Sequence, residues 1–157
     1  MSPCVPDLPP SPLPSPRRLL LADDDDDVRV GIAELLGTVG LEVLQAVSGL
    51  EALEILEGAP RGADAPIVHA ALLDVHMPGC SGLEALPRIQ ELRAGLPCIV
   101  YSGNLTEGLE HSLRLAGACA VLRKPVQPDL LRREVLQAIE SSPYLGPTGF
   151  GNAPMPN

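Results

Sequence analysis

The chain has 157 residues, of which 45% are hydrophobic and 2% are aromatic, and its formal net charge is −9. This length allows one domain of ordinary size, with a core of Leu, Val, Ile and Ala. The negative charge argues against a nucleic-acid-binding protein, which needs a basic face. No apolar run approaches the ~20 residues that span a bilayer, and none has the length of a signal-peptide core. We therefore expect a cytoplasmic protein with no nucleic-acid partner and no membrane partner.

Proline-rich segments flank the expected domain. Residues 1–16 contain seven prolines, and residues 141–157 mix Pro, Gly, Ser and Asn. Both compositions disfavour helix and sheet, so the sequence predicts disordered tails around a folded domain at residues 17–140. The cysteines form no C-x-x-C pair, and in a chain without an export signal we interpret them as reduced thiols. They are Cys4, Cys80, Cys98 and Cys119.

Short apolar runs alternate with stretches of helical period along residues 17–140. Most runs are continuously apolar, which is typical of strands that are buried on both faces of a parallel sheet. In chain order, the predicted strands are Arg18–Ala22, Glu42–Ala46, Ile67–Leu73, Cys98–Tyr101 and Cys119–Leu122.

The stretches between these runs carry the start and stop signals of helices. Pro87 falls inside the third predicted helix, where it indicates a kink or a later start. In chain order, the signals are a cap at Asp26 or Asp27 with an end at Gly40, a capping box Ser48–Glu51 with an end at Gly58, a second box Ser81–Glu84 with Gly95 at its far end, a stop at Gly117, and Pro128 in the first turn of the fifth helix.

Five strands that alternate with five helices predict a doubly wound α/β domain. Right-handed crossover connections then place helices on both faces of the sheet. In such sheets, ligands bind beyond the carboxyl ends of the strands. The residues that directly follow each predicted strand are therefore the first candidates for function.

Charged and polar side chains follow four of the predicted strands. The run Asp23–Asp27 follows the first strand, Asp74 the third, Ser102 the fourth and Lys124 the fifth. Crowded carboxylates repel one another, and a cation would neutralise them. Oxygen ligands suit Mg²⁺, and a carboxylate beside the metal can attack phosphorus to form an acyl phosphate. The lysine and the serine hydroxyl could then bind the phosphoryl oxygens.

The basic residues sharpen this interpretation. Ten of the eleven are Arg, and Lys124 is the only Lys in the chain. A single Lys at a strand end suggests a site that needs a compact, flexible ammonium group in place of a planar guanidinium. Chance retention of a surface lysine is the alternative, and the carboxylates at neighbouring strand ends make it the less attractive one.

The sequence resembles the receiver domains of two-component response regulators over residues 17–140. The resemblance implies a flavodoxin-like fold, with a five-stranded parallel sheet of order 2-1-3-4-5. Each matching segment is weakly specific alone, but all of them in order at the expected spacing are highly specific. The segments are Leu20–Asp24, Leu72–Pro78 with Gly82, Val100–Gly103 and Arg123–Pro125.

The resemblance also implies a role for each matching residue. Asp74 corresponds to the phosphoacceptor, which takes its phosphoryl group from a sensor histidine kinase or a phosphotransfer protein. The implied Mg²⁺ ligands are Asp23, Asp24, Asp74 and the backbone carbonyl of His76, with Asp24 as a direct ligand. Ser102 corresponds to the switch hydroxyl, Lys124 to the lysine that pairs with the phosphoryl group, and Pro125 to a proline after a cis peptide bond.

Two positions need separate comment. Val121 stands where many receivers carry a switch Tyr or Phe, and Tyr101, one residue before Ser102, does not match that position. We therefore expect coupling through the loop after Ser102 in place of an aromatic rotamer exchange. Asn104 lies where the family tunes the lifetime of the phosphoryl group.

Three functional hypotheses follow. The first is a stand-alone receiver, phosphorylated on Asp74, that signals through an unknown downstream protein and catalyses only its own phosphorylation and slow dephosphorylation. The second is a pseudo-receiver, an interaction module of the same fold that acts without phosphorylation. The third is a metal-dependent phosphatase, which would need a second catalytic acid, a role for which His76 is a poor match.

Overall fold

The computed structural model describes residues 16–58 and 67–145. The expected segment 1–16 lies almost entirely outside these residues, as do Cys4 and most of the segment 141–157. The described part of that second segment, residues 141–145, packs onto the domain. Tyr144 donates a hydrogen bond from its hydroxyl to the backbone oxygen of Ala94 at 2.9 Å, and Ser142 is buried.

Strands and helices alternate along the whole described chain, as the sequence predicts. In chain order, the elements are β1 Arg18–Ala22, α1 Asp26–Gly37, β2 Glu42–Ala46, α2 Gly49–Glu57, β3 Ala70–Asp74, α3 Gly82–Leu92, β4 Cys98–Ser102, α4 Glu107–Leu115, β5 Ala120–Arg123 and α5 Pro128–Glu140.

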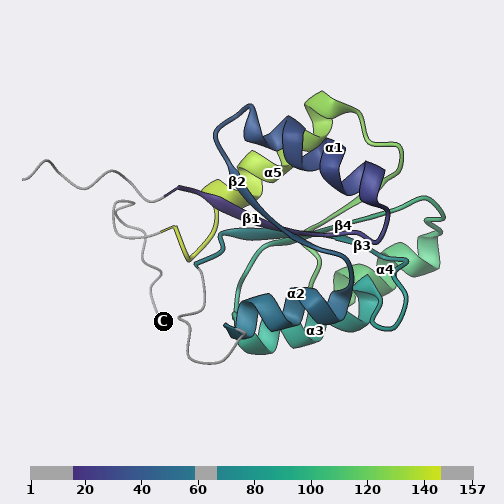
Figure 1. The fold of residues 1–157 in the computed structure, drawn as a ribbon. Coiled ribbons are helices and arrows are strands. Elements are labelled where there is room, and N and C mark those ends of the chain that lie inside the picture. Colours follow the sequence, from purple (N-terminus) through teal and green to yellow (C-terminus); the bar gives the residue numbers. More distant parts are fainter. Residues whose placement is uncertain (1–15, 59–66, 146–157) are drawn as a thin grey trace, which may run out of the picture.

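The five strands form one parallel sheet of order β2-β1-β3-β4-β5, which confirms the predicted order. Helices α1 and α5 cover one face of the sheet, and α2, α3 and α4 cover the other (Figure 1). Because side chains alternate between the two faces along a strand, β1 contributes side chains to the core on both faces of the sheet. Leu20 packs with the three-helix layer, whereas Leu19 and Leu21 pack with α1 and α5.

The ends of the helices agree with most of the predicted signals. Ser81 and Glu84 form a complete capping box at the start of α3, and Gly58 ends α2 in the left-handed conformation. The cap of α1 differs, because Asp25 accepts from the backbone N–H groups of Asp27 and Val28. In a run of five aspartates, sequence alone does not decide which one becomes the cap.

Pro87 lies inside α3, which nevertheless begins at Gly82. The helix therefore does not take the later start that we considered. Three of the strands also differ slightly in their bounds, since β3 spans Ala70–Asp74, β4 extends to Ser102 and β5 spans Ala120–Arg123. Asp74 thus ends its strand, with its side chain at the carboxyl edge of the sheet.

Candidate functional site

Three carboxylates meet at the carboxyl edge of the sheet. Asp23 directly follows β1 and is fully buried, Asp74 ends β3 and is also buried, and Asp24 is exposed. One oxygen from each lies within 4.8 Å of the others. A set of oxygen donors that is open to solvent on one side suits Mg²⁺, which keeps several water ligands. The residues present therefore fit the metal that the sequence implies.

Lys124 follows β5 and reaches into this cluster. Its Nζ lies 3.3 Å from Asp74 Oδ2 and 3.4 Å from Asp23 Oδ2. The peptide bond between Lys124 and Pro125 is cis, as predicted. One ammonium group therefore serves two buried carboxylates, and the lysine identified in the sequence as unusual does lie at the site.

The electrostatics of Asp74 reflect this crowding. Burial raises the pKa of its carboxyl group, and the nearby charge of Asp23 raises it further. A hydrogen bond from the backbone N–H of His76, 3.2 Å long, and the charge of Lys124 act in the opposite direction. The net increase means that the folded chain destabilises the ionised form of this carboxyl group, which an added cation would reverse.

Asp23 is held from several sides. Its Oδ1 accepts from the backbone N–H of Asp25 at 2.8 Å, and its Oδ2 accepts from the hydroxyl of Tyr101 and from Lys124. Arg29 also donates to the backbone oxygen of Asp23 at 2.9 Å. This carboxylate is therefore a fixed element of the site, oriented by protein donors on both of its oxygens.

Tyr101 is the functional residue that the sequence reasoning missed. It does not match the position of the switch aromatic residue, so the resemblance to receiver domains assigns it no role. A tyrosine inside a continuously buried strand needs a partner for its hydroxyl, and this requirement was the available signal. Burial and the hydrogen bond to Asp23 raise the pKa of this hydroxyl, so that it stays a donor.

The remaining predicted residues surround the cluster. Ser102 is buried, and its hydroxyl accepts from the backbone N–H of Asn104 at 3.0 Å, which ties it to the loop after β4. His76 is exposed in the loop after β3, and its backbone N–H faces Asp74. Val121 lies within β5 and is half-buried against the three-helix layer.

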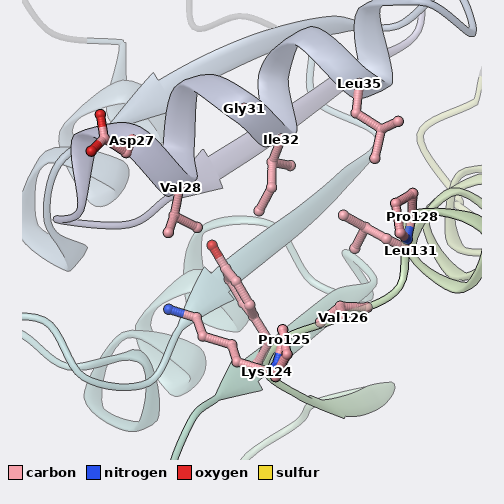
Figure 2. Close-up of a pocket in the computed structure, with 11 residues that line it drawn as sticks. Asp27, Val28, Gly31, Ile32, Leu35, Lys124, Pro125, Val126, Pro128 and Leu131 are labelled. Atoms are coloured by element: carbon pink, nitrogen blue, oxygen red, sulfur yellow. The ribbon is translucent and has the colours of Figure 1, made fainter.

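A largely apolar groove of about 530 Å³ opens beside the carboxylates, between α1 and α5. Val28 and Ile32 of α1 line one wall, and Lys124, Pro125 and Leu131 line the other (Figure 2). Tyr101 also lines the groove. The ammonium group of Lys124 therefore lies between the acidic cluster and an apolar space.

The parallel α/β fold and the acidic cluster at its carboxyl edge together are those of a receiver-type domain, and the comparisons with known proteins identify the family. The model of the response regulator receiver domain matches residues 19–136. The chain therefore belongs to this family. Receiver domains accept phosphoryl groups from histidine kinases or phosphotransfer proteins, and they bind Mg²⁺ through a cluster of Asp residues.

Individual relatives agree with this assignment. The chain is 31% identical to the transcriptional activator protein ExaE of Pseudomonas putida over 129 residues, which is 81% of this chain and 57% of that protein. It is 30% identical to a cyclic di-GMP phosphodiesterase of Thermotoga maritima over 78% of this chain and 31% of that protein. The chain thus spans less than two thirds of the length of these relatives.

A solved structure has the same fold. The CheY-like response regulator receiver domain protein of Methanospirillum hungatei superposes with a TM-score of 0.74 at 27% identity. The match covers 84% of this chain and all of that one. In the described residues, 16–58 and 67–145, no helix is long and apolar enough to cross a membrane.

Proposed function

We propose that this chain is a cytoplasmic receiver that accepts a phosphoryl group on Asp74 from a sensor histidine kinase or a phosphotransfer protein. The reaction depends on Mg²⁺, and the phosphorylated form signals through contacts with another protein. The observation that carries this proposal is the position of Asp74, a carboxylate at a strand end that shares Lys124 with Asp23. Lys124 is the only lysine in the sequence, so no other lysine could pair with a phosphoryl group on Asp74.

The proposed transfer conserves atoms and charge. A carboxylate oxygen of Asp74 attacks the phosphorus of the donor phosphohistidine, the new O–P bond forms, and the N–P bond breaks. The imidazole leaves as a neutral base, because its other ring nitrogen takes a proton from water before the N–P bond breaks. Lys124 and the hydroxyl of Ser102 then bind the phosphoryl oxygens. Asp23, Asp24, Asp74 and the backbone carbonyl of His76 would hold Mg²⁺, which supplies positive charge against the transferred group.

The first test is the intact mass of the protein after incubation with acetyl phosphate and Mg²⁺. The wild type should gain one phosphoryl group, and the gain should disappear when Mg²⁺ is chelated. Asp74→Asn should gain none, because an amide is not a nucleophile of this kind. Asp129→Asn is the matched control, since its carboxylate is exposed in α5 and pairs with Arg132, and it should behave like the wild type.

The outcome also decides between a receiver and a pseudo-receiver. A wild-type protein that gains no phosphoryl group, and that binds no Mg²⁺ by calorimetry, would contradict the proposal and favour an interaction module that acts without phosphorylation. Equal gain in the wild type and in Asp74→Asn would show that another residue is the acceptor.

The proposed signalling step can be followed in the loop that carries Ser102. The hydroxyl of Ser102 accepts from the N–H of Asn104, so a hydroxyl that turns toward the phosphoryl group must give up this bond. We expect phosphorylation to raise amide exchange in the loop between β4 and α4, measured by hydrogen exchange with and without beryllofluoride, a phosphoryl mimic. This loop is the expected route of the signal, because Val121 stands at the usual position of the switch aromatic residue. Unchanged amide exchange would exclude that route.

A further inference from the structure

Tyr101 joins the two groups on which the site depends. Its hydroxyl donates to Asp23 Oδ2, and the Nζ of Lys124 lies 4.6 Å from the centre of its ring. Tyr101 belongs to β4 and Asp23 follows β1, with β3 between the two strands. The tyrosine side chain therefore reaches across the central strand to hold a carboxylate on its far side.

Asp23 needs this contact because it is fully buried. A buried carboxylate that loses its partners is strongly destabilising, since water does not replace them. Its Oδ2 has two side-chain donors, the hydroxyl of Tyr101 and the more distant Nζ of Lys124. Within the described part of the chain, removal of one donor therefore leaves the other as the sole side-chain partner of that oxygen.

Lys124 has competing partners, whereas the hydroxyl of Tyr101 bonds to Asp23 alone among the residues that the structure describes. The ammonium group lies almost equally far from Asp23 and Asp74, and a phosphoryl group on Asp74 would attract it more strongly than either carboxylate does alone. When Lys124 moves to that group, it withdraws from Asp23. The hydroxyl of Tyr101, which is fixed by a buried ring, stays.

We propose that Tyr101 is a positioning residue, whose hydroxyl holds Asp23 so that Lys124 can leave Asp23 for the phosphoryl group on Asp74. This inference rests on the proposed function of Asp74. It assigns a role to a strand residue that does not match the position of the switch aromatic residue. In this role the hydroxyl of Tyr101 matters only when Lys124 moves away from Asp23. A tyrosine that merely filled the core would show no such dependence.

The test uses two phenylalanine variants. Tyr101→Phe removes the hydroxyl and keeps the ring, so that the packing of the ring and its contact with Lys124 remain. Tyr144→Phe is the matched control, because its hydroxyl bonds to the backbone of Ala94 and lies away from the acidic cluster. The chain has two tyrosines in total, so these variants cover all phenolic hydroxyls.

The single lysine provides a direct readout of its own position. Protein labelled with lysine that carries ¹³C only at Cε gives one lysine signal, because Lys124 is the only Lys. The ring of Tyr101 should shift this signal while the ammonium group lies against it. In the wild type, beryllofluoride with Mg²⁺ should move the signal toward its ordinary position, as Lys124 leaves the ring and Asp23.

In Tyr101→Phe we expect the midpoint of the beryllofluoride titration to rise about tenfold, and phosphorylation by acetyl phosphate to slow by a similar factor. Tyr144→Phe should match the wild type in both measurements. A Tyr101→Phe protein that stays within twofold of the wild type in midpoint and rate would overturn the proposal. A wild-type lysine signal that does not move on phosphorylation would also overturn it, since Lys124 would then not leave Asp23.

The failure of this proposal can be told apart from that of the proposed function. If the wild type accepts neither a phosphoryl group nor beryllofluoride, both fall together. If the wild type is phosphorylated on Asp74 and Tyr101→Phe responds equally well, the receiver function stands and the positioning role of Tyr101 is wrong.

Discussion

Polar groups are buried at both edges of the sheet, but the two edges satisfy them differently. At the amino edge, His69 accepts from the backbone N–H of Arg18 through Nδ1 at 2.9 Å, and the backbone N–H of His69 donates to the backbone oxygen of Arg18. The amide of Gln90 is also satisfied on both of its atoms. At the carboxyl edge, two buried carboxylates share the ammonium group of Lys124.

This difference separates stability from function within one sheet. At the amino edge the ion pair between Arg18 and Glu42 is partly exposed, and the more buried polar groups are neutral. Each of these neutral groups has its own partner, and such networks stabilise a unique fold. The carboxyl edge keeps like charges together, which costs stability until a cation arrives. The comparison predicts that substitutions at the carboxyl edge respond to Mg²⁺, whereas substitutions at the amino edge do not.

The largest effect is expected for Lys124→Met, which removes the shared cation from Asp23 and Asp74. We expect the free energy of unfolding to fall by about 2 kcal/mol without Mg²⁺, and part of this loss to be recovered with Mg²⁺. Chemical denaturation with and without the metal measures both numbers. Arg114→Met is the control, because its pair with Glu110 is exposed and is worth less than about 1 kcal/mol. If both variants lose the same free energy of unfolding, the carboxyl edge does not depend on its shared cation, and the contrast between the two edges fails.

The next effect has the opposite sign. Asp74→Asn should raise the free energy of unfolding by about 1 kcal/mol without Mg²⁺, since it removes a charge that burial and Asp23 both disfavour. The gain over the wild type should shrink when Mg²⁺ is added. Thermal unfolding of both proteins with and without the metal is the measurement. A loss of stability in the metal-free variant would mean that the pairing with Lys124 outweighs the repulsion.

A smaller loss is expected on the amino side of the domain. Tyr144→Phe removes the hydrogen bond to the backbone oxygen of Ala94 and should lower the free energy of unfolding by about 0.5–1 kcal/mol. The loss should be the same with and without Mg²⁺, because the acidic cluster is not involved. If the effect depends on Mg²⁺, the two edges are coupled and the comparison needs revision.

The smallest effect concerns pH. Burial lowers the pKa of His69 below its usual 6.5, so the unfolded chain binds a proton at a higher pH than the folded chain does. This contribution to stability is therefore present above pH 6.5 and is lost as the pH falls below it. We expect His69→Gln to reduce the drop in the free energy of unfolding between pH 7.5 and pH 5.5. If the variant loses as much stability as the wild type between these pH values, the loss comes from other titrating groups.

Much of this architecture could be predicted from the sequence. The continuously apolar runs indicated the number of strands, and the resemblance to receiver domains implied their order in the sheet. The residues after the runs included Asp23, Asp74 and Lys124, which the fold does bring together. These features depend on local patterns and on the fixed geometry of parallel sheets. The alternation of strand and helix therefore carries most of the information about the candidate site.

The contacts of Tyr101 and Ser102 could not be predicted in the same way. Tyr101 meets Asp23 across β3, and the sequence contains no local pattern that records a distance between two strands that are not neighbours. The hydroxyl of Ser102 bonds within its own loop to Asn104, which depends on the path of that loop. Such details follow from tertiary packing, so only the structure provides them.

The loop after Asp74 is confined by two glycines. A Cβ atom added at Gly82 would lie 2.7 Å from the backbone oxygen of Asp74, and one added at Gly49 would lie 2.5 Å from the backbone oxygen of Cys80. Both distances are too short for a methyl group. The starts of α2 and α3 fit against this loop because Gly49 and Gly82 have no side chain. An alanine at either position would displace the loop by steric pressure without any change in charge. The two glycines therefore offer a purely mechanical way to shift the backbone beside Asp74, separately from the electrostatics of the site.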